Sequence, residues 1–533
     1  MIAALSGPIL PLLLLATSLV PAALIFPLPD RAETTRRVIN LLGAGIKVVL
    51  AVLLAIGVFR GVEFEARMQF LPGIELVLRA DPIPVLFVFL SALLWFTTTV
   101  YAIGYLARHD HRSRFFGFFG LCVTATMGVA LAGNLVTFLV FYELLTITTY
   151  PLVVHRGTSA ARRAGRTYLI YTITGGAVLL VGTAWLQAIA GTTAFAGPDA
   201  LQPLVADDRG ALIAIFVLLI AGLGVKAALV PLHGWLPGAM AAPAPVSALL
   251  HAVAVVKAGA YGIVRVVHDL YGAPLAGELG LLTPLAVVAA TAIIYGSVRA
   301  LAQDGIKRRL AYSTVSQLSY IVLGASVLSL LSVTAAIAHL VHQGIMKVTL
   351  FYAAGILEHD HDITRISELD GVGRRAPATM VAFTIGAFGM VGLPPTVGFV
   401  TKFTLGTGAV EAGAWWVVVV LVASTVLNAA YFLPPVARAW FARDPTTDDT
   451  AADETTDDPA AAATTCGDAT APTATSAART DRPTGRDAEP WLLLPTLVTA
   501  ATVLVLGVVA GVPFSPLDWA GDIAEILVSE GGP

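Results

Sequence analysis

Charged residues are scarce in this sequence. Only 13% of its 533 residues are Asp, Glu, Lys or Arg and 57% are hydrophobic, whereas soluble globular proteins are about 25% charged. The formal net charge of −3 gives no reason to expect a nucleic acid or a strongly acidic partner. This composition excludes most soluble folds and is typical of a membrane protein.

Cysteine is almost absent as well. Cys122 and Cys466 form no CxxC pair and lie in no His/Cys cluster, which argues against a disulfide framework, a zinc site and an iron–sulfur cluster. The sequence contains no GxGxxG motif after a strand and no Walker A loop. It therefore predicts no metal ion and no bound cofactor in this chain.

Long apolar runs are abundant instead. A bilayer core about 30 Å thick needs about 20 apolar residues for each crossing, and the sequence predicts an all-α polytopic membrane protein with about 14 spans. The first run has no preceding basic residue and no convincing cleavage site, so we interpret it as a retained span. The expected spans are 3–29, 38–59, 82–106, 115–132, 134–154, 168–190, 211–240, 245–267, 281–300, 311–329, 331–356, 378–405, 415–437 and 491–511.

The placement of arginine and lysine predicts the orientation, because short cytoplasmic loops accumulate these residues. With the N-terminus outside, the inner loops hold 19 basic residues, and the outer loops and span ends hold five, which are Arg60, Arg67, Arg79, Arg209 and Arg265. We therefore expect a multi-pass protein of a prokaryotic cell membrane, with the N- and C-termini both outside.

One polar segment interrupts the apolar pattern. Residues 444–489 are rich in Thr, Ala and Asp and carry 11 acidic residues and three arginines. Such a segment has too few apolar side chains to offset the entropy of ordering. We expect a disordered acidic cytoplasmic linker there, followed in residues 491–533 by the last span and an external C-terminal tail.

The chain contains six lysines, and five of them lie inside apolar spans, where a charged side chain is costly. Arginine does not lose its proton in a protein, whereas a desolvated lysine can take up and release one near neutral pH. The buried lysines therefore predict a proton relay. For Lys47, which lies in no motif, a snorkelling or packing role is favoured. The five are Lys47, Lys226, Lys257, Lys347 and Lys402.

Glu143, in the stretch FYELLTITTY, is the one acidic residue deep in a span. A buried carboxylate stays charged only beside a cationic partner, and Lys226 is the candidate. A static ion pair that fixes helix packing is the alternative, but it leaves the other membrane lysines unexplained.

Glycine and proline interrupt two spans, in residues 222–245 and 386–402, and each interrupted stretch carries a lysine. Broken helices at membrane depth free backbone carbonyls, and a matching pair in two halves of a chain is typical of inverted-repeat transporters. The prolines expected at the breaks are Pro231, Pro237, Pro394 and Pro395.

This pattern predicts a division of the chain into an N-terminal segment and two halves. Residues 1–114 form an N-terminal segment of three spans. The two halves that would be related by the inverted repeat are 115–267 and 281–437.

Four histidines are candidates for supporting positions in the relay, since the pKa of histidine lies near neutral. An ordinary structural role, in the core or at a helix end, remains open for them. The cluster EHDHD at residues 358–362 resembles a metal site only in composition, and we interpret it as a solvated turn in a cytoplasmic loop. The four candidates are His233, His251, His339 and His342.

Several stretches resemble one family, the antiporter-like subunits shared by multisubunit Mrp-type cation/proton antiporters, respiratory complex I and membrane-bound hydrogenases. They follow the family's order between about residues 115 and 440. The stretches are FYELLTITTYPLV, GVKAALVPLHGWLPGAMAAPAPVSALLHAVAVVKAGAYG, AYSTVSQLSYIVLG, HLVHQGIMKVTLFYAAG and GVGRRAPATMVAFTIGAFGMVGLPPTVGFVTKF.

The resemblance implies fourteen spans, two inverted five-helix repeats made of spans 4–8 and 9–13, and broken helices seventh and twelfth in order. It implies that Glu143 pairs with Lys226 and that Lys257 connects two half-channels. The region of His342 and Lys347 would continue the path to Lys402. In this region Gln343 occupies a position where many relatives have His.

By its length the chain looks most similar to the D-type subunit of Mrp antiporters. The resemblance therefore implies a proton-translocating subunit of a Na+/H+ antiporter that works with other membrane subunits of one complex. Two alternatives stay open. One is a pumping subunit of a complex I-like quinone oxidoreductase or a membrane-bound hydrogenase, and the other is a proton-conducting partner in an inorganic-carbon uptake complex.

Overall fold

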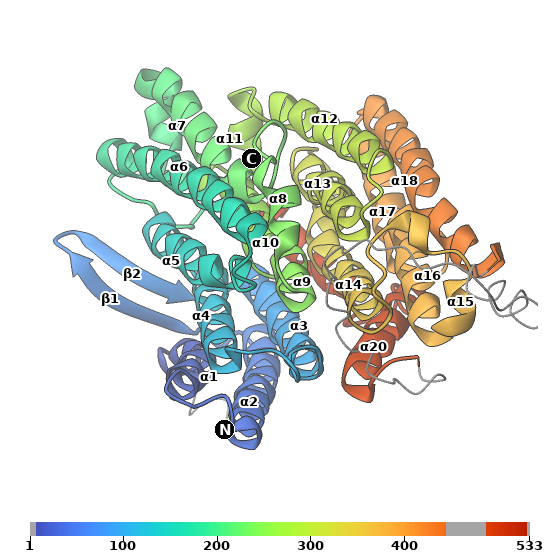
Figure 1. The fold of residues 1–533 in the computed structure, drawn as a ribbon. Coiled ribbons are helices and arrows are strands. Elements are labelled where there is room, and N and C mark those ends of the chain that lie inside the picture. Colours follow the sequence, from blue (N-terminus) through green and yellow to red (C-terminus); the bar gives the residue numbers. More distant parts are fainter. Residues whose placement is uncertain (1–6, 444–486, 530–533) are drawn as a thin grey trace, which may run out of the picture.

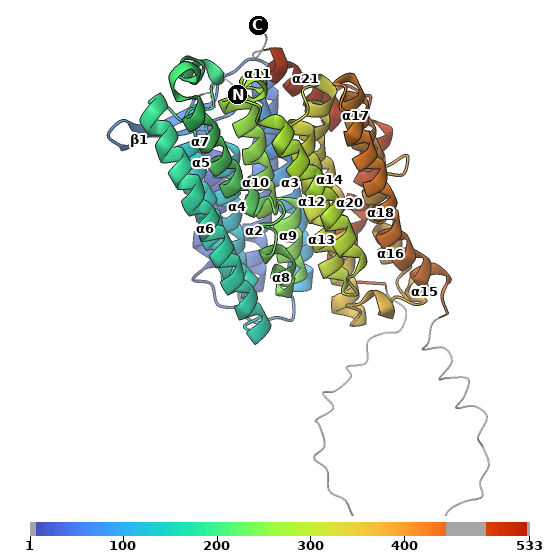
Figure 2. The same cartoon turned by 90° about the horizontal axis from the view of Figure 1, so that it is seen from above.

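Long helices standing side by side make up most of the molecule (Figures 1 and 2). The structure is a computed structural model that describes residues 7–443 and 487–529. Eleven helical segments in these residues are long and apolar enough to cross a membrane, and α1 and α16 are shorter apolar helices. The chain is a polytopic, predominantly helical membrane protein.

The N-terminal segment contains three of these helices, α1 (Ile9–Ile25), α2 (Glu33–Phe59) and α3 (Pro82–Tyr105). An antiparallel hairpin, β1 (Glu65–Leu71) and β2 (Ile74–Arg79), joins α2 to α3 and projects from the bundle (Figure 1). The expectation of a purely helical chain missed this hairpin. Its local signals are β-forming residues on both sides of a Pro-Gly turn, where Gly73 has a positive φ of 77°.

The middle of the chain forms seven α-helices from α4 to α10 and then a short α11. Side-chain caps start α5 and α6, since Asn134 accepts a hydrogen bond from the Thr137 N–H and Thr158 accepts one from the Ala161 N–H. The helices are α4 (Arg112–Ala130), α5 (Leu135–Val153), α6 (Ser159–Ala190), α7 (Val205–Lys226), α8 (Trp235–Gly238), α9 (Ala244–Ala252), α10 (Val255–Arg265) and α11 (Ala273–Glu278).

The remainder of the bundle is built from α12 to α21. The most apolar stretches of the spans Ala244–Leu270 and Leu330–His361 are entirely buried in the chain, whereas only a third of the corresponding stretch is buried in α2, α18 and α20. Polar groups on α10 and α14 are therefore shielded by other helices. The helices are α12 (Leu282–Leu301), α13 (Ile306–Ala325), α14 (Leu330–His361), α15 (Val372–Arg375), α16 (Pro377–Val391), α17 (Val397–Glu411), α18 (Trp415–Phe441), α20 (Pro490–Val508) and α21 (Pro516–Ser529).

The helices α11 and α21 lie at one face of the bundle, and the C-terminal end of α18 lies at the opposite face (Figure 2). The expected acidic linker and Cys466 fall outside the described residues, except for residues 487–489. Asp487 is part of the fold, because its carboxylate accepts hydrogen bonds from the N–H (3.2 Å) and the hydroxyl (2.6 Å) of Thr379 at the start of α16. The expected external tail contains the helix α21.

Candidate functional site: a line of buried lysines

Three helices are interrupted inside the bundle. Helix α7 ends at Lys226, and the next helical residue is Trp235, whose indole N–H donates to the Val225 carbonyl (2.7 Å). Helix α16 ends at Val391, and α17 begins at Val397. Pro231, Pro394 and Pro395 lie in these non-helical stretches, and Pro237 lies within α8.

The third interruption separates α9 from α10. Val253 (φ −132°, ψ −52°) and Ala254 (φ −92°, ψ −95°) leave the helical region three residues before Lys257. No glycine or proline marks this place in the sequence, so sequence analysis did not predict it.

Glu143 on α5 and Lys226 at the end of α7 form the first pair of the site. The Glu143 Oε1 lies 4.0 Å from the Lys226 Nζ. The lysine is fully buried, donates a hydrogen bond to the Tyr142 carbonyl and lies 3.3 Å from the centre of the Tyr142 ring. Among the described residues, Glu143 is the only carboxylate within 4.0 Å of any of the five span lysines.

Lys257 on α10 lies next to the buried helix α14. Its Nζ donates to the Leu340 carbonyl (2.6 Å), between the positions of His339 and His342. His342 and Gln343 are fully buried, and none of their side-chain nitrogen or oxygen atoms has a hydrogen-bond partner among the described residues. Buried polar groups of this kind normally have partners, so the His342 ring has a nitrogen available to accept a proton and the Gln343 amide has unused hydrogen-bonding capacity.

Lys347 on α14 is joined to His251 through α13. The Lys347 Nζ donates to the Leu310 carbonyl (3.0 Å) and to the Ser313 hydroxyl, and Thr314 donates to the same carbonyl (2.9 Å). The Thr314 hydroxyl also lies 2.9 Å from the His251 Nδ1. Since its proton goes to the carbonyl, the hydroxyl accepts from His251, which assigns the proton to Nδ1 and leaves Nε2 free as a base.

Lys402 on α17 bridges the break between α16 and α17. Its Nζ donates to the Met390 (3.0 Å) and Val391 (2.8 Å) carbonyls at the end of α16. The neighbouring Thr401 hydroxyl donates to its own helix backbone and lies 3.1 Å from the His339 Nδ1. The direction of the hydrogen bond between His339 and Thr401 depends on the tautomer of the histidine ring.

The other residues predicted from the sequence lie outside this line. His233 lies in the stretch after α7, 4.9 Å from the Tyr295 ring centre. Lys47 does not snorkel, because it is fully buried, donates to the Ser18 hydroxyl (2.7 Å) and lies 4.8 Å from the Trp95 ring centre. The cluster at residues 358–362 is not a loop, since it forms the last turn and C-cap of α14.

A pocket of about 780 Å3 is lined by residues of α6, α8, α13 and α14. There the Glu358 carboxylate binds Arg156 (2.7 Å) and Lys307 (3.0 Å), and Lys307 also donates to the Ala242 carbonyl (2.9 Å). Burial favours the neutral form of Arg156, but the Glu358 charge outweighs it and raises the pKa of Arg156 above its ordinary value. The network ties the loop after α8 to α13 and α14.

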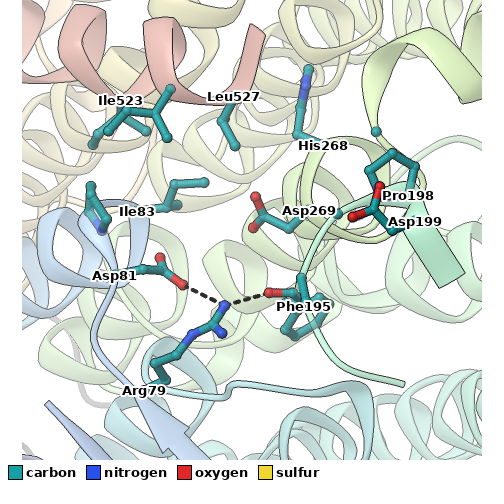
Figure 3. A pocket seen from close by; sticks show the side chains of 15 residues that line it. Arg79, Asp81, Ile83, Phe195, Pro198, Asp199, His268, Asp269, Ile523 and Leu527 are labelled. Carbon is teal, nitrogen blue, oxygen red and sulfur yellow. Dashed lines mark hydrogen bonds and ion pairs between the residues drawn. The ribbon is translucent and has the colours of Figure 1, made fainter. Parts of the chain in front are cut away.

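A second pocket, of about 580 Å3, is lined on one side by Ile523 and Leu527 of α21 (Figure 3). Figure 3 shows Arg79 between the Asp81 carboxylate and the Phe195 carbonyl. Arg265 is buried beside this pocket and forms ion pairs with Asp81 (3.0 Å) and Asp269 (2.7 Å). Arg265, an outer basic residue in the predicted topology, is therefore held in a buried network.

The partners of the lysines were missed by sequence analysis. Most of these partners are main-chain carbonyls. Because every residue carries a carbonyl, no pattern of side chains in the sequence predicts which ones bind the lysines. The hydroxyls of Ser313 and Thr314 lie in AYSTVSQLSY, where a run of polar residues in an apolar span was the available signal.

Comparisons with known proteins agree with this architecture. A family model described as NADH:quinone oxidoreductase/Mrp antiporter, TM, matches residues 132–428. NADH-quinone oxidoreductase subunit N of Desulforudis audaxviator is 37% identical over 372 residues, which cover 69% of this chain and 73% of the relative. The D-type subunit of the Na(+)/H(+) antiporter of Bacillus subtilis is 28% identical over 393 residues, which cover 73% and 79%.

The fold is also similar to a chain of the Mrp complex from Dietzia sp., with a TM-score of 0.79, 25% identity and coverage of 97% of this chain and 98% of the other. The match to the family model takes in the residues from Glu143 to Lys402. The chain therefore belongs to the family of antiporter-like subunits that NADH:quinone oxidoreductases and Mrp antiporters share.

Proposed function

We propose that this chain is the proton-translocating subunit of a multisubunit Na+/H+ antiporter, most similar to the Mrp D-type subunit. Its protons move along Glu143, Lys226, Lys257, Lys347 and Lys402. The other membrane subunits of the complex contribute the remainder of the exchange.

One observation carries the proposal. Four lysines lie on interrupted or central helices, with Lys402 partly buried and the other three fully buried. Three of the four donate only to neutral oxygens, while Lys226 alone has a carboxylate within 4.0 Å. A buried ammonium with neutral partners holds its proton weakly, since burial disfavours the charged form. Such groups suit transient protonation better than a fixed structural charge.

The site also contains bases that could bridge the lysines. The assigned tautomer leaves the Nε2 atom of His251 without a partner among the described residues. His251 can take a proton at Nε2 while its Nδ1–H donates to the Thr314 hydroxyl, and His339 contacts the Thr401 hydroxyl through Nδ1. Both histidines are therefore proposed as supporting relays, with His342 beside Lys257.

Mutual repulsion provides a reason for directed movement. A proton that arrives on one buried lysine raises the energy of a second positive charge nearby, because the surroundings screen charges poorly. Opening the Glu143–Lys226 pair would free Lys226 to pass its proton toward Lys257. The two interrupted halves, 115–267 and 281–437, are proposed to be the inverted repeats that bring protons in and out.

A redox-driven complex is the second candidate. It is supported by the 37% identity with NADH-quinone oxidoreductase subunit N, which exceeds the 28% identity with the D-type antiporter relative. In that case the same lysine line would pump protons when electron transfer occurs in another subunit.

Everted membrane vesicles containing the complete native complex test both candidates. We expect a Na+ pulse to release protons from acidified vesicles, and Lys226→Met or Glu143→Gln to remove most of that signal. Lys47→Met is the matched control, because it removes a buried lysine outside the line. A proton signal that needs NADH or another electron donor would favour the redox complex, and unchanged signals in both variants would refute the lysine line.

A further inference from the structure

Gly176 on α6 lies directly against the Glu143 carboxylate. A Cβ atom built on Gly176 would lie 2.5 Å from the Glu143 Cδ and 3.0 Å from its Oε2, and it would also overlap Oε1, the oxygen that faces Lys226. These three are the nearest atoms to that position. The Glu143 carboxylate therefore occupies the space that a side chain at position 176 would fill.

The neighbouring residue, Gly175, holds α6 close to α7. A Cβ on Gly175 would lie 2.8 Å from the Val225 Cβ, and one on Gly222 of α7 would lie 2.7 Å from the Gly175 carbonyl oxygen. Val225 directly precedes Lys226. These two adjacent glycines thus affect both members of the ion pair. Gly175 allows α7, which carries Lys226, to pack closely against α6, and Gly176 leaves room for the Glu143 carboxylate.

The line contains a similar contact at its other end. A Cβ on Gly392 would lie 2.9 Å from the Lys402 Cδ and 3.4 Å from its Nζ. On α10, a Cβ on Gly259 would lie 2.8 Å from the Lys226 carbonyl carbon. Glycines therefore border three of the ionisable residues in the proposed path.

We propose that Gly176 is a positioning residue that determines the distance between Glu143 and Lys226, and through it the rate of proton transfer. This inference rests on the proposed function. It assigns a role to a residue with no ionisable group and no contact with a transported ion.

The atoms that obstruct an alanine at position 176 belong to the flexible end of a side chain, so the helices themselves need not move. Alanine is also a better helix former than glycine. Gly176→Ala is therefore expected to assemble normally while displacing the carboxylate. Gly175→Ala would instead meet the Val225 Cβ and the main-chain oxygen of Gly222 and push two helices apart.

The test is a double-mutant cycle on the complete complex in vesicles, with initial proton transport measured across a range of pH. The four proteins are the native chain, Gly176→Ala, Glu143→Asp and the double variant. Asp is one methylene shorter and withdraws the carboxylate from the added methyl group. Gly45→Ala, in a span where nothing lies within 4 Å of the added atom, is the control.

We expect Gly176→Ala to slow transport about tenfold or more and to shift its pH profile, since misplacing a reacting group by about 1 Å commonly costs up to about a hundredfold. In the Glu143→Asp background the same substitution should cost little, which would reveal coupling. Equal losses in both backgrounds, or native transport in Gly176→Ala, would overturn the inference. If Glu143→Gln itself transports normally, the proposed function fails, whereas an impaired Glu143→Gln with a normal Gly176→Ala defeats only the positioning role.

Discussion

Neutralising Glu143 provides the most direct quantitative test of the site. Its Oε1 lies 4.0 Å from the Lys226 Nζ. Two unit charges at about 4 Å attract by about 4 kcal/mol at an effective dielectric constant of about 20. Because the Glu143 side chain is 32% exposed in this chain, we reduce the attraction for screening and use about 2 to 3 kcal/mol.

Glu143→Gln removes this stabilisation from every state in which Lys226 carries its proton. A step that needs protonated Lys226 should slow by about 30- to 150-fold, since about 1.4 kcal/mol corresponds to a factor of ten. Glu143→Asp keeps the charge and moves it back by about 1.5 Å, which lowers the attraction by about 1 kcal/mol or less and should slow transport only about three- to fivefold.

Initial rates of proton release from vesicles measure this series, with equal amounts of assembled complex confirmed for each variant. The order native, Asp, Gln is the expected result. A Gln variant within about threefold of native, or an Asp variant as slow as Gln, would show that charge at this position does not control the rate.

Three further outcomes are expected. Lys47→Met should leave the thermal unfolding midpoint unchanged or raised, because a well-packed apolar side chain replaces a buried amine, and a lowered midpoint would contradict this. Ser313→Ala should slow transport severalfold with little loss of stability, about 1 kcal/mol, since it removes one acceptor of Lys347. The hydrogen bond from Arg438 lowers the pKa of Asp370 below its ordinary value, so its small stabilising contribution is present above about pH 4 and is lost as pH falls further. The stability difference between the native chain and Asp370→Asn should accordingly narrow between about pH 6 and about pH 3, and a constant difference would refute the role of ionisation.

Local sequence patterns were sufficient to predict most of the membrane-spanning helices. A run of about 20 apolar residues must cross the bilayer as a helix, because no water is present there to satisfy its main-chain groups. The helices α3, α5 and α12 accordingly begin and end within a few residues of the expected runs. Glycine and proline likewise predicted the breaks after α7 and α16, since proline lacks the main-chain N–H that donates a hydrogen bond in a helix.

Sequence analysis did not predict features that depend on contacts between residues far apart in the chain. The break at Val253 and Ala254 involves two residues that favour no break on their own. The hairpin of β1 and β2 is short and lies between two segments with strong helical patterns. The helix α21 lies in the part of the chain after the last span, where we expected only an external tail. The last turn of α14 extends past the apolar run because Glu358 is held by Arg156 and Lys307.

The sequence alone predicts many membrane crossings, with five lysines and one glutamate inside the apolar runs. That follows from composition, because each such charge is costly in a bilayer and its presence requires a reason. The folded structure was needed to identify which groups accept hydrogen bonds from the lysines. Their partners are chiefly carbonyls of Leu340, Leu310, Met390 and Val391, identical in chemistry to every other carbonyl in the chain and distinguished only by where the folded helices place them.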